Sequence, residues 1–164
     1  DPSQYLAAAR LPFCWVNGTN DFAYPPDSWR QSARQTAGPR TLCLRIRMPH
    51  GHGAAGEQPG EILAFMDQHL RGGPGLAVLR QYGRDGERTW ARFDTPVTIT
   101  RAELCYTRMR GVWQERHWES QPATWQASDG LASAMVPPTA QAWYLNLVDE
   151  RDLVTSSPHQ ERGD

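Results

Sequence analysis

An acid and two histidines stand where they could share a proton. Asp21 closes the polar loop that follows an apolar run over residues 11–16, and His50 and His52 follow a second strand-like segment. A carboxylate paired with one imidazole nitrogen fixes the tautomer of the ring and stabilises its protonated form, so that the other nitrogen acts as a general base. These residues predict an acid–base pair, with the ordinary alternative that both loops are simple turns.

The elements around these loops predict that they meet. Residues 11–16 are typical of a strand buried on both faces, residues 29–37 of a helix, and residues 41–48 alternate apolar and polar side chains as a strand does. A helix that joins two parallel strands returns the chain to the same end of the sheet. Asp21 and the two histidines are therefore expected at the carboxyl edge of neighbouring strands, where open α/β sheets place their sites.

A second helix is predicted with Pro59 as its first residue, ending at Gly72 and Gly73. Its apolar side chains recur at helical spacing and are expected to face the sheet: Ile62, Phe65, Met66, His69 and Leu70. His69 is then expected as a hydrogen-bonded residue of the core. The order strand, helix, strand, helix predicts a parallel α/β layer over residues 1–73.

Only strand patterns follow in residues 74–158. Alternation and turn sequences predict strands over residues 76–82, 88–93, 101–107, 114–119, 124–127, 131–136 and 141–148. This spacing, without helical patterns, is typical of a small β-sandwich. The polar stretch from Ser156 onward is expected to fray, with residues 159–164 as a disordered tail.

The composition excludes several classes of function. All 17 basic residues are arginine, so the chain has no lysine for a phosphate-binding loop or a Schiff base. The net charge of −1 disfavours a nucleic-acid partner or an anionic membrane surface, and no apolar run is long enough for a membrane span. Cys14, Cys43 and Cys105 are too widely spaced for a disulfide framework or a metal knuckle, and we expect buried free thiols.

The two polar loops resemble those of the α/β-hydrolase family. Residues 17–25, Asn-Gly-Thr-Asn-Asp-Phe-Ala-Tyr-Pro, are similar to the acid loop, in which a strand ends in Gly-x-x-Asp. Residues 48–52, Met-Pro-His-Gly-His, with Glu-Gln-Pro at 57–59, are similar to the histidine loop. The family order places nucleophile, acid and histidine in that sequence along the chain. The resemblance implies Asp21 and His52 as the last two members, with His50 as the second choice.

The whole chain resembles the C-terminal part of bacterial acetylxylan-esterase and dienelactone-hydrolase-like proteins. The later motifs that carry this resemblance are Ala-Glu-Leu-Cys-Tyr-Thr at 102–107, Trp-x-x-Arg-x-Trp at 113–118 and Trp-Tyr-Leu-Asn-Leu at 143–147. It implies an α/β part followed by an all-β part: the last βαβα units of an α/β-hydrolase sheet, then a small immunoglobulin- or fibronectin-like β-sandwich. It also implies a serine carboxylic-ester hydrolase acting on an acetyl ester of a sugar or polysaccharide, no metal or organic cofactor, and a secreted or periplasmic location.

The nucleophile of that family is missing from the sequence. No Gly-x-Ser-x-Gly occurs, and none of the eight serines stands in a strand–turn–helix elbow. An acid and a histidine without a nucleophile cannot form an acyl-enzyme, so this chain alone is expected to be inactive. We expect a C-terminal fragment whose nucleophile comes from the N-terminal remainder of the hydrolase domain. Its first strand would then lack a partner on one side, and its helices would leave apolar surface uncovered.

Two other functions stay open. His50-Gly-His52 with Glu57 also resembles the metal-binding His-x-His…Glu pattern of cupins, and imidazole and carboxylate ligands suit Fe, Mn or Zn. Alternatively, residues 74–158 form a non-catalytic carbohydrate-binding or structural module. The aromatic residues that we consider for stacking on a sugar are Trp113, Trp118 and Trp125. Strand tryptophans usually belong to the core, because each ring buries a large apolar area.

Overall fold

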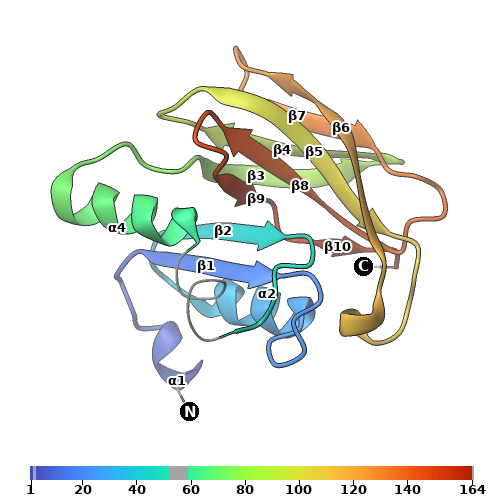
Figure 1. Ribbon diagram of the computed structural model, residues 1–164, viewed down its shortest axis with the longest axis horizontal. Coiled ribbons are helices and arrows are strands. Elements are labelled where there is room, and N and C mark those ends of the chain that lie inside the picture. The colour runs from blue at the N-terminus through green and yellow to red at the C-terminus, as the bar shows by residue number, and fades with distance from the viewer. Residues whose placement is uncertain (2, 52–58, 164) are drawn as a thin grey trace.

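A small parallel sheet with helices precedes a larger antiparallel sheet in the computed structural model, which describes residues 1, 3–51 and 59–163 (Figure 1). The small sheet contains β1 (Phe13–Gly18) and β2 (Arg40–Arg45), which pair in parallel. The helices are α1 (Ser3–Leu6), α2 (Pro26–Gln35) and α4 (Gly60–Arg71). The predicted mixed α/β part followed by a mostly β part is confirmed. No helix of the described residues is long and apolar enough to cross a membrane.

The two longer helices form for the local reasons that the sequence suggests. A proline occupies the first turn of α2, where its missing N–H costs nothing, and the Thr36 hydroxyl donates to the Ala33 carbonyl at the end of that helix (2.7 Å). Pro59 precedes α4, and Gly72 ends it in the left-handed conformation with φ of 73°. Gly72 confirms the predicted end signal, whereas α4 begins one residue later than predicted, with Pro59 just before its first turn.

The apolar face of α4 matches the predicted core face only in part, because Ile62 and Phe65 are half-buried while the other three residues are exposed. Met66 and Leu70 are 47% and 72% exposed, and His69 is exposed and packs edge-on against Phe65 at 4.5 Å between ring centroids. The prediction of a buried His69 is therefore wrong. The first turn of α4 is anchored through the fully buried Glu61.

Glu61 connects α4 to both sheets. Its Oε1 accepts a hydrogen bond from Arg45 Nε at the end of β2 (2.9 Å) and one from the Val154 N–H (2.9 Å). A second guanidinium nitrogen of Arg45 also contacts this carboxylate. A buried carboxylate needs such partners, so the ion pair fixes where α4 begins.

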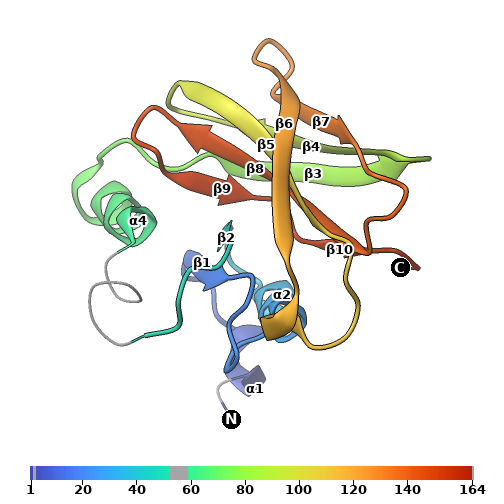
Figure 2. The ribbon, with the colours of Figure 1, turned by 45° about the vertical axis from the view of Figure 1, so that its right-hand side comes forward.

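The larger sheet has eight strands in the order β10-β8-β5-β6-β7-β4-β3, with β9 also paired to β8. They are β3 (Val78–Asp85), β4 (Arg88–Asp94), β5 (Ile99–Thr107), β6 (Trp118–Gln126), β7 (Leu131–Met135), β8 (Ala142–Asp149), β9 (Val154–Ser156) and β10 (Gln160–Glu161). Figure 2 shows β6 crossing between the two halves of the sheet. The halves face each other across a core of apolar side chains from β4, β5, β7 and β8.

The bridging strand β6 corrects two of the predicted strands. Residues 114–119 and 124–127 were expected to be separate, but β6 is continuous and a short 3₁₀ turn, η1 (Trp113–Glu115), precedes it. β6 pairs with β5 through residues 118–123 and with β7 through residues 124–126. Pro122 lies close to this change of partner, where a missing N–H is tolerated.

The end of the chain is ordered, which corrects the expected disordered tail over the described residues 159–163. β10 pairs with β8, and His159 is fully buried beside the ring of Trp113. Ser157 donates its N–H to the Leu145 carbonyl (2.8 Å) and accepts the Leu145 N–H at its hydroxyl (2.9 Å). Polar residues in this segment thus complete the hydrogen bonds of β8 instead of being solvated.

A second core joins the small sheet to the outer face of the large one. Its buried members are Trp29, Ala33, Leu42, Leu44, Cys105, Trp113, Trp118, Ala142 and Tyr144. In both Figure 1 and Figure 2 the small sheet lies between α2 and the large sheet. Two of the three tryptophans that we considered for sugar stacking, Trp113 and Trp118, are therefore core residues, and Trp125 packs against the first core.

Buried side chains also satisfy the free edge of β2. The Leu44 N–H donates to Ser156 Oγ (2.8 Å), and Asn146 Nδ2 donates to the Leu44 carbonyl (3.3 Å). The Ser156 hydroxyl donates in turn to Asn146 Oδ1 (2.6 Å). Leu44, Asn146 and Ser156 are all buried, so water cannot replace these bonds.

Ser156→Ala is expected to lower the free energy of unfolding by about 1–3 kcal/mol, because it leaves the Leu44 N–H and Asn146 Oδ1 buried without this partner. Urea unfolding measures the effect. Ser120→Ala, at an exposed position of β6, serves as the control and is expected to stay within about 0.5 kcal/mol of wild type. Equal stability of the two variants would contradict this role of Ser156.

His159 is expected to make stability depend on pH. Burial is the main cause that lowers the pKa of His159, with the charge of Arg30 adding to it. Below the ordinary value near 6.5 the unfolded chain takes up a proton that the folded chain resists, so stability falls as pH decreases from that value. His159→Phe removes this pH-dependent contribution to the free energy of unfolding. Urea midpoints at pH 7.5 and 5 are expected to differ less for His159→Phe than for wild type or for the exposed control His117→Phe.

Candidate acid–base site

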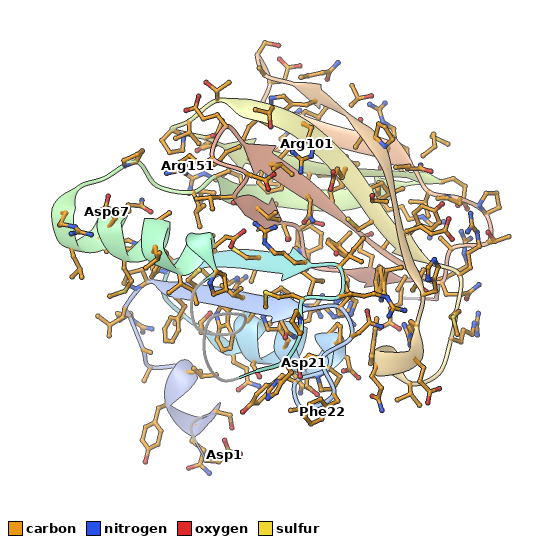
Figure 3. All side chains as sticks on the ribbon, in the orientation of Figure 1. Asp1, Asp21, Phe22, Asp67, Arg101 and Arg151 are labelled. Atoms are coloured by element: carbon orange, nitrogen blue, oxygen red, sulfur yellow. The ribbon has the colours of Figure 1, made fainter. Side chains whose placement is uncertain are left out.

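Asp21 and His50 meet beyond the carboxyl ends of β1 and β2. His50 Nδ1 lies 2.9 Å from Asp21 Oδ2, and the side chains are 24% and 7% exposed. Figure 3 labels Asp21 in the loop between β1 and α2, next to Phe22. The parallel pairing of the two strands brings these loops together, as the order of elements predicts.

The second oxygen of Asp21 is held by its own loop. Oδ1 accepts hydrogen bonds from the Ala23 N–H and the Tyr24 N–H, both at 2.8 Å. Burial raises the pKa of Asp21, but the hydrogen bonds from Tyr24, His50 and Ala23 together outweigh burial and leave the pKa below its ordinary value. Asp21 is therefore a fixed carboxylate at neutral pH, with Oδ2 directed to the imidazole.

Thr19 ties the acid loop to the histidine loop. Its N–H donates to the Arg45 carbonyl (3.0 Å), and its hydroxyl accepts the N–H of Arg47 (3.0 Å) and donates to Asn20 Oδ1 (2.8 Å). Thr19 is fully buried. These bonds fix the start of the segment that leads to His50.

Gly18 allows the two loops to approach. A Cβ atom at this position would lie 2.1 Å from the carbonyl oxygen of Met48, far inside any real contact. The glycine of the Gly-x-x-Asp pattern is thus required by the close passage of the two backbones.

Asn20 links the acid loop to the large sheet. Its Nδ2 lies within hydrogen-bond distance of three carbonyls around η1, those of Trp113 (3.2 Å), Gln114 (3.0 Å) and Arg116 (2.7 Å). Arg116 stacks on Trp113 with 3.5 Å between the guanidinium carbon and the ring centroid. Sequence reasoning missed the roles of Thr19 and Asn20, because their partners lie in distant segments.

Two aromatic rings flank the imidazole of His50. Phe22 contacts it edge-on at 4.9 Å between centroids, and Tyr24 lies at 5.8 Å. Phe22 and Tyr24 are 69% and 65% exposed. The surroundings of the histidine are therefore partly apolar and open to a ligand or to another polypeptide.

The other predicted members of the site lie outside the described residues. These are His52, the first choice for the base, and Glu57 of the metal alternative. Within residues 1, 3–51 and 59–163, no three His, Cys, Asp or Glu side chains are grouped as a metal site. Two clefts of about 530 and 580 Å³ flank the small sheet, and neither is lined by Asp21 or His50.

Comparison with known proteins yields one distant similarity of structure. No family model matches the sequence. No curated protein matches it. Among solved structures, the chain is similar to a carbohydrate acetylesterase from Xanthomonas citri, with a TM-score of 0.42 and 14% identity, over 92% of this chain and 41% of that one. The chain thus spans about two fifths of the length of that protein.

Asp21→Asn is expected to destabilise the protein at neutral pH, and this loss of stability is expected to be smaller at acidic pH. The pKa of Asp21 is lower in the folded protein than its ordinary value of 3.8. The contribution of the ionised carboxylate to the free energy of unfolding is therefore present above that pH and is lost as the pH falls through the folded-state pKa. The gap in unfolding free energy between wild type and Asp21→Asn should therefore narrow below about pH 4. Asp129→Asn, at an exposed turn, is the control. A gap that does not change with pH would contradict the ionised, hydrogen-bonded state of Asp21.

Proposed function

We propose that Asp21 and His50 are the acid and the base of a serine-type carboxylic-ester hydrolase whose nucleophile lies on a polypeptide segment outside this chain. The observation that carries the proposal is the 2.9 Å contact between His50 Nδ1 and a carboxylate that two backbone N–H groups hold in place. This arrangement fixes both the tautomer and the orientation of the ring.

The geometry suits proton transfer in acyl transfer. With Nδ1–H donated to Asp21, the neutral ring of His50 carries its basic lone pair on Nε2. That nitrogen would accept the proton of a serine hydroxyl as the serine oxygen attacks the ester carbonyl, and would return it to the alcohol oxygen as the C–O bond breaks. Water then attacks the acyl-serine in the same way, releasing the acid and restoring the serine. The charge of Asp21 stabilises the imidazolium in both steps.

The uncovered surfaces of the α/β part support a missing segment. Among the described strands, β1 pairs with β2 alone, so its other edge has no partner. The first four residues of β1 are only half-buried, and Leu63, Met66 and Leu70 of α4 are exposed. We interpret β1, α2, β2 and α4 as the last units of a larger α/β-hydrolase sheet, followed by a sandwich-like domain, with the rest of that sheet covering these surfaces.

The substrate class is inferred from the sequence resemblance. Acetylxylan-esterase-like proteins act on acetyl groups of sugars, and we propose an acetyl ester of a sugar or polysaccharide as the substrate. His52 is the alternative base, because the resemblance favours it while the described geometry favours His50.

Substitutions test the proposal in the complete protein, which carries this chain together with the covering segment. His50→Gln and Asp21→Asn are each expected to lower kcat/KM for p-nitrophenyl acetate by about 10³-fold or more. His52→Gln and the exposed control His117→Gln are expected to stay within a few-fold of wild type. The isolated 164-residue chain is expected to show no turnover.

Three results would each contradict a different part of the proposal. Loss of activity in His52→Gln, with His50→Gln still active, assigns the base to His52. Labelling of a serine of this chain by a fluorophosphonate probe places the nucleophile inside it. Full activity of the Asp21→Asn variant would contradict the proposed catalytic role of the Asp21–His50 pair.

A further inference from the structure

A cleft lies on the solvent-facing side of the half of the large sheet formed by β3, β4 and β7, away from the small sheet and the acid–base site. It has a volume of about 310 Å³ and is lined by Asp85, Arg88, Trp90, Arg92 and Leu131. Alternate residues of a strand point to the same face, so Arg88, Trp90 and Arg92 of β4 project together. We call it the Trp90 cleft.

The floor of the Trp90 cleft is an indole laid over a glycine. Gly83 of β3 is the cross-strand partner of Trp90. A Cβ atom at Gly83 would meet Cζ2 of Trp90 at 2.7 Å and Cε2 at 3.0 Å. The absent side chain lets the ring lie against the sheet, and the indole is half-buried and borders the cleft.

Two guanidinium groups beside the indole are held by the sheet. Arg88 Nη2 donates to the Ser133 hydroxyl (2.8 Å), and Arg92 Nη1 donates to the Asp129 carbonyl (3.0 Å). Each guanidinium has five N–H groups, so a single such bond restrains the group and leaves further donors for a ligand. Asp85 adds a carboxylate that accepts hydrogen bonds from hydroxyl groups.

We propose that the Trp90 cleft binds a glycan that carries carboxylate groups. A sugar ring offers an apolar C–H face, which packs on a flat aromatic ring, and a rim of hydroxyls, which planar charged side chains bind. Two arginines against one aspartate favour an anionic sugar, and arginine pairs with carboxylates in a bidentate manner.

A single-stranded nucleic acid is the other polymer that stacks on aromatic rings. Such sites combine several aromatic residues with a positively charged groove that follows the phosphates. The Trp90 cleft has one aromatic residue and contains Asp85, and the chain as a whole has a net charge of −1. The observations therefore favour the glycan.

The binding site does not depend on the hydrolase proposal, and the test uses the 164-residue chain itself. Isothermal titration compares hexagalacturonate, neutral cellohexaose and a 12-nucleotide oligothymidylate. We expect hexagalacturonate to bind most tightly. Trp90→Leu should weaken its binding at least tenfold, because it removes the flat ring on which the sugar packs.

The arginines and the controls separate charge from stacking. The double variant Arg88→Gln, Arg92→Gln should bind hexagalacturonate at least tenfold more weakly than wild type. It should no longer prefer hexagalacturonate to the neutral cellohexaose. Tyr5→Ala and Arg71→Gln, at exposed positions of the α/β part, should change nothing. If Trp90→Leu lowers the melting temperature by more than a few degrees, Trp90→Phe replaces it, with an expected affinity between those of wild type and the arginine double variant.

Several outcomes would overturn the proposal. They are the absence of binding to hexagalacturonate, equal affinity for the two hexasaccharides, wild-type affinity of a folded Trp90→Leu, and tighter binding of the oligothymidylate that is lost with Trp90. The last result would instead assign the cleft to a nucleic acid.

Discussion

The buried polar junction at the free edge of β2 is the constraint on which the rest of the structure depends. A strand edge inside a protein needs partners for its N–H and carbonyl groups, and an additional strand would normally supply them. Here Ser156 and Asn146 supply them to Leu44 through side chains. Because both residues belong to the large sheet, β2 is fixed against β8 and β9. The chain reaches His50 directly from β2, so the junction also determines where the histidine lies.

The large sheet therefore helps to position the loop that carries Asp21. Asn20 binds the carbonyls around η1, and Thr19 passes that restraint to the segment that follows β2. Gly18 lets the two loops come close enough for these short bonds. Asp21 is thus held on one side by its own backbone and on the other by a network that ends on a different sheet. A fixed carboxylate is what an imidazole base requires, since a small displacement would break the 2.9 Å contact.

Local signals in the sequence correctly predicted those features of the fold that depend on residues close together in the chain. The helix ends, the parallel pairing of the first two strands and the meeting of Asp21 with a histidine loop all follow from spacing and topology. Sequence reasoning was wrong where burial depends on distant partners. Leu70 has the pattern of a core residue, yet no described layer covers it. Ser156 belongs to a polar stretch that reads as a tail, yet its hydroxyl is fully buried in the junction. Neither spacing nor composition determines which of His50 and His52 faces the acid, because this depends on the path of the loop.

The two edges of the small sheet differ in a way that bears on the proposed reaction. The β2 edge is satisfied within the chain, whereas β1 has no partner beyond β2 among the described strands. A strand that paired in parallel with β1 would end at the same edge of the sheet as Asp21 and His50, since parallel strands share the direction of their carboxyl ends. Among the described strands, the β1 edge is thus the open edge of the small sheet, and under the proposed function the segment that carries the nucleophile would extend the sheet from there.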